Sequence, residues 1–413
     1  MRFVNFLVNN ARWVAGGFLL TFFSSFGQTF FIALSAGDIR AEYDLSHGGF
    51  GMLYMFATLA SALTLPRLGK TVDTFRVVHV LALTAPMLAL ACFALAFSNS
   101  LVLLAVAIYG LRLFGQGMMT HIAMTAMGKW FAAQRGRAVS FSAIGVNFGE
   151  ALFPLAFVLV AGLIGWRNSW VAAGLVLLLV AFPAIFALMR VEREPQSVVA
   201  NINAPPVHNW TRSEVLRDPF FYVLLTGVLA PPFIGTTIFF HQVYLVELRG
   251  WSQEAFAASF VLMSSMTVIF ALVCGHLVDR FSALRLLPFF LIPLAVACIT
   301  LAAVTEQYGV FFFMALLGLS YGFSGTLFGA VWPEVYGIAH LGSIRSMIVA
   351  VMVFMTAVGP GLTGTLIDMG VPYSGQILAF GVYCLMASVV LFAASARLRA
   401  RLRGSVAIAG AQG

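Results

Sequence analysis

Two ionisable side chains stand where the chain is otherwise almost entirely apolar. Arg112 lies in the run YGLRLFGQGMMTH, and Glu150 lies in GVNFGEALFP. Burying one such charge in lipid costs at least about 2.5 kcal/mol, so charged residues there usually face a cavity. A guanidinium can bind an anionic solute, and a desolvated carboxyl group can carry a proton. The pattern predicts a solute or proton site, and a buried ion pair that fixes helix packing is the alternative.

The composition shows what kind of element must hold these two charges. Of the 413 residues, 61% are hydrophobic and only 9% are charged, whereas a soluble domain carries roughly 25% charged residues. Such a chain cannot cover its surface with polar groups, so lipid is the expected solvent for most of it. Because helices satisfy their own backbone in lipid, we expect an all-α integral membrane protein.

Twelve apolar runs are long enough to cross a bilayer, which takes about 20 residues. They cover residues 14–36, 48–66, 77–97, 101–127, 138–164, 170–189, 220–246, 255–278, 286–304, 310–331, 346–367 and 374–396. The first is too long for a signal peptide, so we predict that it is retained.

Basic residues set the predicted orientation of these twelve helices. Most of the 23 Lys and Arg residues fall in loops that are cytoplasmic if the N-terminus is inside, as the positive-inside rule requires. We therefore expect both termini in the cytoplasm, in a multi-pass protein of the bacterial cytoplasmic (inner) membrane. The net charge of +8 then reflects topology and predicts no nucleic-acid partner.

An internal repeat divides the chain. The phrase GKTVDTF, from Gly69, returns 206 residues later as GHLVDRF, from Gly275, and other landmarks keep the same offset. A polar, proline-containing segment separates the copies and has room for a short surface helix near Trp210. The repeat predicts an N-terminal six-helix bundle (1–190), a cytoplasmic linker (191–219) and a C-terminal six-helix bundle with a basic tail (220–413).

The repeated Gly-x-x-x-Asp phrase resembles the signature of the major facilitator superfamily of secondary transporters, and the resemblance covers essentially the whole chain. It implies two six-helix repeats that move against each other, with a latch at the cytoplasmic side that breaks as this side opens. Charges that only set the topology are the alternative. The predicted conformational latch comprises Gly69, Asp73, Arg76, Arg135, Arg137, Gly275, Asp279 and Arg280, with Arg135 or Arg137 as possible partners of the first carboxylate.

A narrower resemblance concerns WFAAQRGRAVSFSAIG, from Trp130 to Gly145. This segment is similar to the one between the fourth and fifth helices of monocarboxylate and oxalate/formate transporters. The resemblance implies a carboxylate as the transported solute.

The superfamily resemblance also places the first, fourth, seventh and tenth helices around a central cavity. Gln116 and Asn147 lie about one helical turn from the two buried charges. Pro231-Pro232 predicts a kink in the seventh helix, beyond which His241 is either a proton-sensitive gate or simply a hydrated residue. The predicted substrate-binding residues are Arg112, Gln116, Glu150, Asn147, Gln28, Ser25, Tyr321, His241 and Gln242.

These observations predict a secondary transporter that works by alternating access. We expect proton-coupled uptake of a small organic anion such as a monocarboxylate, with Arg112 as the anion contact and Glu150 as its partner or as the proton carrier. The alternative is an efflux pump for drug-like or aromatic metabolites; a transporter-like sensor and a membrane enzyme are remote alternatives. The sequence contains no HExxH, GxSxG, Walker or CxxC pattern, so no catalytic residue, cofactor or metal is predicted. The expected partners are the solute, protons and the lipid bilayer, and we expect a monomer.

Overall fold

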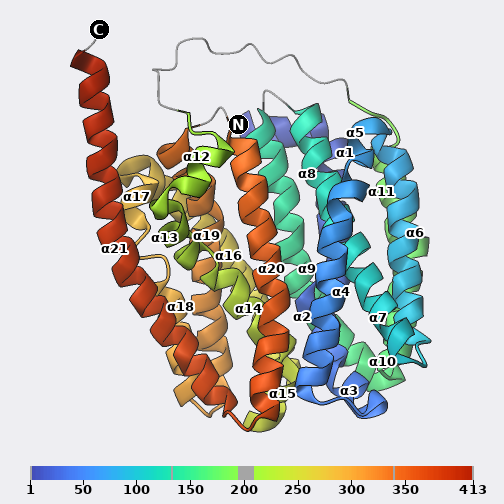
Figure 1. Cartoon of the computed structure of the whole chain (residues 1–413). Coiled ribbons are helices and arrows are strands. Elements are labelled where there is room, and N and C mark those ends of the chain that lie inside the picture. The colour runs from blue at the N-terminus through green and yellow to red at the C-terminus, as the bar shows by residue number, and fades with distance from the viewer. Residues whose placement is uncertain (1, 132–133, 194–208, 338–339, 412–413) are drawn as a thin grey trace. The chain divides into compact units, whose positions relative to one another are not determined.

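A computed structural model gives the structure of the chain (Figure 1), and it describes residues 2–131, 134–193, 209–337 and 340–411. Within these ranges the regular elements are all helices, and no strand occurs. Ten helices of the described part are long and apolar enough to cross a membrane, and one bent pair, Val8–Gly27 with Thr29–Tyr43, makes an eleventh candidate. The prediction of an all-α membrane protein is confirmed, whereas the number of twelve spans and the orientation remain predictions.

Residue contacts divide the chain into two compact units. Unit 1 comprises Met1–Ile202, Phe239–Val261 and Pro360–Asp368, and unit 2 comprises Asn203–Ile238, Leu262–Gly359 and Met369–Gly413. Three stretches that are remote in sequence therefore form unit 1. The predicted division at 190 and 219 remains a prediction, and residues 194–208 of the predicted linker lie outside the described residues.

The helices of the first 190 residues belong to unit 1. They are α1 (Arg2–Phe23), η1 (Ser24–Gly27), α2 (Thr29–Ile32), η2 (Ala33–Ser35), α3 (Ala36–Tyr43), α4 (His47–Gly69), α5 (Thr71–Thr74), α6 (Val77–Ala96), α7 (Leu101–Gly110), η3 (Leu111–Met119), α8 (Thr120–Trp130), α9 (Arg135–Ile164), α10 (Trp166–Val176), η5 (Leu177–Ala181) and α11 (Phe182–Met189). Among them, η3 and η5 are π-helical, and η1 and η2 are 3₁₀ helices.

The remaining helices follow the linker. They are α12 (Arg212–Arg217), α13 (Pro219–Val228), α14 (Ala230–Phe240), α15 (Gln242–Arg249), α16 (Gln253–Phe281), α17 (Ala283–Leu286), α18 (Ile292–Ala303), α19 (Tyr308–Tyr336), α20 (Leu341–Asp368) and α21 (Tyr373–Ala411). Helix α15, the start of α16 and the end of α20 belong to unit 1.

Three predicted runs differ from the helices observed. The run 14–36 is not one helix but is broken at Gln28, whose backbone is extended. The run 220–246 is interrupted next to Pro231-Pro232, between α13 and α14, as the expected kink requires. The run 286–304 contains the shorter apolar helix Ile292–Ala303, because Pro293 at the start of α18 lacks the amide needed to continue a helix backwards.

A short helix near Trp210 is confirmed as α12 in unit 2. Thr211 begins it with a capping box: its hydroxyl accepts from the amide of Glu214, whose carboxylate accepts from the amide of Thr211. The Trp210 amide donates to the Tyr336 carbonyl at 3.0 Å. The capping box thereby satisfies the amides of Thr211 and Glu214, which would otherwise lack a partner at the helix start. The Trp210 bond fixes the end of the linker to α19.

Candidate functional site

Arg112 is the centre of the candidate site. It lies on the π-helical segment η3, about midway along the span Leu101–Trp130, and it is only 2% exposed. Its Nη1 donates to the Gly27 carbonyl and to the Thr29 hydroxyl, both at 3.2 Å. Its guanidinium carbon lies 5.5 Å from the centroid of the Tyr54 ring, within the range of a cation–π contact.

The break in the first span supplies the carbonyl that Arg112 uses. In a continuous helix the amide of Phe31 would bond to the carbonyl of Gly27. Because Gln28 is extended, this amide bonds instead to the Gln28 carbonyl at 3.2 Å. The Gly27 carbonyl is therefore left to accept from the guanidinium. Irregular backbone at membrane depth is tolerated where protein groups or a cavity satisfy it, and broken helices in transporters often form binding sites.

Glycines allow the broken span to approach η3 closely. A Cβ on Gly27 would lie 2.6 Å from the Cα of Gly115 and would overlap the Leu111 carbonyl oxygen. A Cβ on Gly115 would in turn lie 2.6 Å from the Cα of Gly27. Because backbone atoms cannot rotate away, only glycine fits at both positions. This close crossing brings the guanidinium within reach of the freed carbonyl.

A tyrosine that sequence reasoning missed completes the surroundings of Arg112. The hydroxyls of Thr29 and Tyr54 share a hydrogen bond of 2.6 Å, and both residues are buried. The Tyr54 ring packs against Phe240 at 4.7 Å, and Phe50 stacks on the same phenylalanine at 5.1 Å. A tyrosine within an apolar run carries no sequence signal of this role, because its partners come from three other segments.

The positive charge of Arg112 has no carboxylate against it within the described part of the chain. Its partners there are a carbonyl, a hydroxyl and an aromatic face. Its Nε is buried and lacks a hydrogen-bond partner there. A guanidinium offers five N–H donors, so this site retains donors and a net charge that an anionic ligand can satisfy.

Glu150 lies elsewhere in unit 1 and does not pair with Arg112 among the described residues. Its neighbour Gly149 packs so tightly on Ser25 that a Cβ would overlap the serine Oγ. That Oγ is buried and makes no hydrogen bond in the described structure. Four predicted residues are half-buried, and their side chains form no hydrogen bond within the described ranges: Gln28, Gln116, Asn147 and Glu150.

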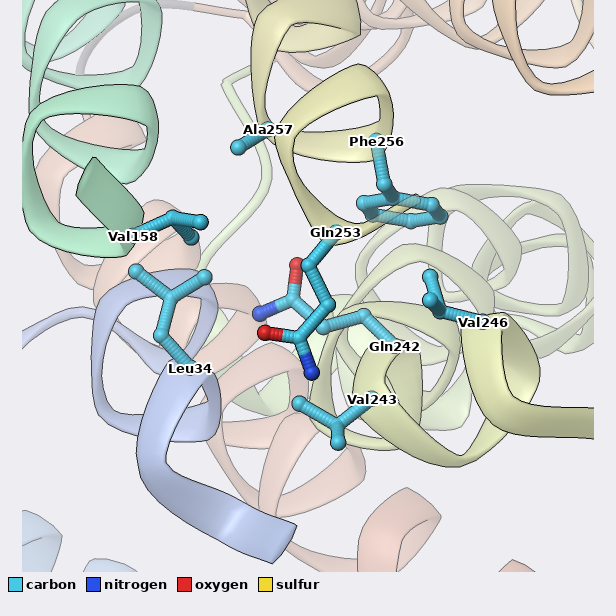
Figure 2. Close-up of a pocket in the computed structure, with 8 residues that line it drawn as sticks. All are labelled: Leu34, Val158, Gln242, Val243, Val246, Gln253, Phe256 and Ala257. Atoms are coloured by element: carbon cyan, nitrogen blue, oxygen red, sulfur yellow. The ribbon is translucent and has the colours of Figure 1, made fainter. Parts of the chain in front are cut away.

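His241 and Gln242, also predicted, lie where α15 begins. Gln242 Nε2 donates to the Phe30 carbonyl at 2.7 Å. In Figure 2 its carboxamide lies beside that of Gln253, between Leu34 and Phe256, in a small pocket of about 10 Å³. A second small pocket, also of about 10 Å³, is lined by His241 together with Arg40, His47 and Tyr244.

Tyr321 belongs to unit 2, on α19. A Cβ on Gly235 of α14 would meet its hydroxyl, so α14 and α19 approach closely at this point. The structure thus places eight of the nine predicted substrate-binding residues in unit 1, and this one in unit 2.

In the first copy of the predicted conformational latch, the Asp73 carboxylate pairs with a lysine that was not among the predicted latch residues. Lys129 Nζ lies 2.6 Å from the Asp73 carboxylate, and it donates to the Val72 carbonyl at 3.2 Å. The Gly69 carbonyl contacts the ring of His121, at 3.2 Å from Nε2.

The other predicted latch residues have different surroundings. Arg76 Nε lies 3.7 Å from the Glu192 carboxylate. Arg137 is exposed, and the side chain of Arg135 lies outside the described structure. In the second copy, Asp279 is exposed and Arg280 lies over the ring of Phe281 at 5.2 Å, while Gly275 faces Thr326.

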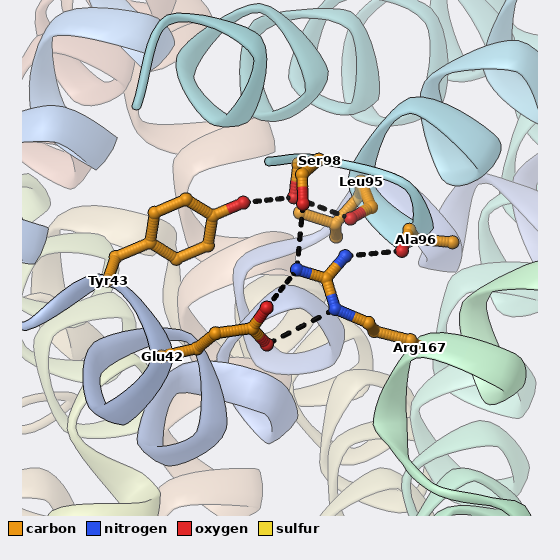
Figure 3. A network of polar contacts seen from close by, with 6 residues as sticks. All are labelled: Glu42, Tyr43, Leu95, Ala96, Ser98 and Arg167. Carbon is orange, nitrogen blue, oxygen red and sulfur yellow. Dashed lines mark hydrogen bonds and ion pairs between the residues drawn. The ribbon is translucent and has the colours of Figure 1, made fainter. Parts of the chain in front are cut away.

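A polar network at the end of unit 1 that contains α3 was also missed by sequence reasoning. Figure 3 shows the Arg167 guanidinium between the carboxylate of Glu42 and the carbonyls of Ala96 and Ser98. Tyr43 donates to the Ser98 hydroxyl at 2.7 Å. This network ties α10 to α3 and to the end of α6, and its groups are bonded to one another, so it is a structural feature.

Among the described residues, no group of three or more His, Cys, Asp or Glu side chains could hold a metal ion. The four cysteines are buried as free thiols.

Comparisons with known proteins agree with this architecture. The sequence profile of the Major Facilitator Superfamily matches residues 17–360. A bacterial homologue of the human lysosomal transporter Spinster, inward-facing and unoccupied, is 17% identical with a TM-score of 0.69, over 94% of this chain and 97% of that one. A point mutant of the nucleoside transporter NupG is 12% identical with a TM-score of 0.69, over 92% and 99% of the two chains. At these identities the likeness shows the fold alone. No curated protein matches the chain in sequence.

Proposed function

We propose that this chain, which belongs to the major facilitator superfamily and is a secondary transporter, carries a small organic anion such as a monocarboxylate. Arg112 would bind the anionic group. The observation that supports this is a guanidinium only 2% exposed within a membrane span, with no carboxylate bonded to it in the described structure. A buried charge without a counter-ion is costly, and an anionic solute relieves this cost each time it binds.

The direction of transport and its coupling are part of the same proposal. With the N-terminus in the cytoplasm, Glu150 carries a proton inward together with the anion. It lies within the span Gly136–Ile164 and has no bonded cation among the described residues, so a neutral, protonated form suits its apolar surroundings. The protein acts as a monomer in the bacterial cytoplasmic membrane, and its helices form the two six-helix repeats predicted from the sequence.

A ligand-stabilisation experiment on the purified, detergent-solubilised protein tests the anion site. Ligands that bind only the folded state raise its apparent stability by mass action. The probes are mono- and dicarboxylates, sugars, nucleosides and amphipathic cations. We expect a carboxylate to stabilise the wild type, and Arg112→Gln to weaken its binding on the order of 30-fold or more, because a buried charge pair is lost.

Two further variants make this result specific to the site. Arg112→Lys keeps the charge but loses the planar fork, so it should retain part of the affinity. Arg167→Gln removes an arginine that bonds to Glu42, and it should leave the affinity unchanged. The anion proposal is wrong if no carboxylate stabilises the wild type, or if carboxylate binding survives unchanged in Arg112→Gln.

One observation favours efflux of an apolar compound as a second candidate function. A pocket of about 180 Å³ is lined mainly by apolar side chains, among them Phe26, Phe31, Phe153 and Phe157. Ligand sites are lined predominantly by apolar and aromatic side chains, as this pocket is. Stabilisation by neutral or cationic amphiphiles alone, unchanged in Arg112→Gln, would support efflux in place of anion uptake.

A further inference from the structure

The start of α4 and the end of α20 meet along a seam in which glycines allow the two backbones to approach closely. A Cβ on Gly48 would lie 3.1 Å from the Cα of Thr365, and one on Gly51 would lie 2.5 Å from the Pro360 carbonyl oxygen. A Cβ on Gly364 would lie 2.7 Å from the carbonyl carbon of His47. The α4–α20 seam, formed by residues 47–55 and 360–368, is therefore a contact of backbone on backbone at these glycines, and the side chains of Met52 and Met55 pack on Gly361.

A single carboxylate fastens the end of this seam. The Asp368 carboxylate, at the last residue of α20, accepts from the amide of His47 at 3.1 Å and from the amide of Gly48 at 2.8 Å. The amide of Gly49 is bonded to the hydroxyl of Ser46 at 2.9 Å.

These bonds complete the N-terminus of α4. The first amide with a partner inside the helix is that of Phe50, which bonds to the carbonyl of Ser46. The three preceding amides have no partner within their own helix. Ser46 satisfies one, so the other two depend on Asp368. A carboxylate at a helix N-terminus is further stabilised by the helix dipole.

The two helices come from opposite halves of the sequence. Helix α4 is the second predicted span and α20 the eleventh, yet residues 360–368 group with unit 1 while the remainder of α20 groups with unit 2. In a transporter of two moving repeats, a contact of this kind must separate whenever the end of the protein that bears it opens. At Gly51 and Gly364 the neighbouring atoms are backbone atoms, so no side chain has to rearrange at these points when the seam separates.

We propose that Asp368 is a positioning residue of the transport cycle, which holds the α4–α20 seam closed by binding the His47 and Gly48 amides and releases them when that end opens. The inference rests on the chain being a transporter and is independent of the solute. Loss of the carboxylate shifts the population toward the state with an open seam, since the two amides can then bond to water.

Cysteine cross-linking measures the closed seam directly. A Cβ on Gly361 would lie 3.5 Å from the Cβ of Met55, within the range found in disulfides. The double variant Met55→Cys/Gly361→Cys should therefore oxidise rapidly when the seam is closed. Each single variant shows the background of the four native cysteines, which are buried.

The test compares cross-linking rates in full-length protein in membranes, with three changes added separately to the double variant. Asp368→Asn should slow the reaction on the order of tenfold, since two hydrogen bonds to a charged group are weakened. Asp44→Asn removes an exposed acid two residues before Ser46 and should have no effect. Ser46→Ala removes the hydroxyl that caps α4 and also bonds to the Asp368 carboxylate, but it keeps the charge and both amide bonds of Asp368, so it should slow the reaction less than Asp368→Asn does.

Two results would overturn the proposal. One is a wild-type cross-linking rate in Asp368→Asn. The other is an equal slowing in Ser46→Ala, which would show that fraying of α4, and not release of the carboxylate, controls the reaction. Should Asp368→Asn fail to fold, Asp368→Glu replaces it, because its longer side chain keeps the charge but displaces it from the two amides. A rate below that of the wild type is expected, and an unchanged rate again refutes the role.

Discussion

Replacing Gly27 by alanine tests the crossing that presents a backbone carbonyl to Arg112. The new methyl group would lie 2.6 Å from the Gly115 Cα and 2.7 Å from the Gln116 amide nitrogen. These are backbone atoms, so the two spans must move apart. Overpacking of this kind costs roughly 1–3 kcal/mol. At about 2–4 °C per kcal/mol for a unit of this size, the expected fall in melting temperature is roughly 2–12 °C.

A matched control comes from a glycine with free space around it. Gly162, near the end of α9, has no atom within 4 Å of an added Cβ. Alanine there should be neutral or stabilise by up to about 1 kcal/mol, because alanine is the better helix former. The two substitutions add the same methyl group, so opposite or clearly different changes in stability isolate the effect of the crossing.

The measurement is thermal unfolding of the purified protein, followed by tryptophan fluorescence, with and without the anion that stabilises the wild type. Moving the broken span also moves the Gly27 carbonyl away from the guanidinium. Gly27→Ala should therefore lose most of the ligand-induced stabilisation as well. A melting temperature equal to that of Gly162→Ala, with normal ligand stabilisation, would refute the role assigned to this close approach.

Two further outcomes are expected. In liposomes, Glu150→Gln should retain exchange of the anion across the membrane but lose accumulation driven by a proton gradient, since the amide cannot carry a proton. Accumulation at the wild-type level would remove Glu150 from the coupling mechanism. Arg167→Gln should lower the melting temperature without changing the transported solute. The partly exposed Arg167–Glu42 ion pair contributes up to about 1 kcal/mol, and the carbonyls of Ala96 and Ser98 lose a donor. A change in solute preference would contradict the structural role of Arg167.

The two buried charges show how far sequence reasoning reaches in this protein. Arg112 and Glu150 are conspicuous because charge is rare in apolar runs, so a site near them could be predicted from composition alone. A direct bond between them was an open possibility, and the structure gives Arg112 a carbonyl, a hydroxyl and a ring as partners instead. Spacing along the chain places residues on a helix but cannot say toward which neighbour that helix turns.

The latch residues show the same limit. The repeated glycine and aspartate could be found by comparing the two halves of the sequence, but Lys129, the partner of Asp73, comes from a helix about 55 residues away with no motif of its own. Asp368 had no signal either, because an acid at the end of an apolar run is ordinary, and its role depends on where the start of α4 lies.

The sequence by itself determined that the chain is an all-α membrane protein, because solvent preference and span length follow from composition and the hydropathy of consecutive residues. The transporter superfamily was indicated by the resemblance of the repeated Gly-x-x-x-Asp phrase. Only the tertiary structure decided that the first span breaks at Gln28, that its free carbonyl faces Arg112, and that glycines let both approach. These features arise from contacts between segments that are remote in sequence. A backbone carbonyl is identical in every residue, so only the fold determines which one is free to bind.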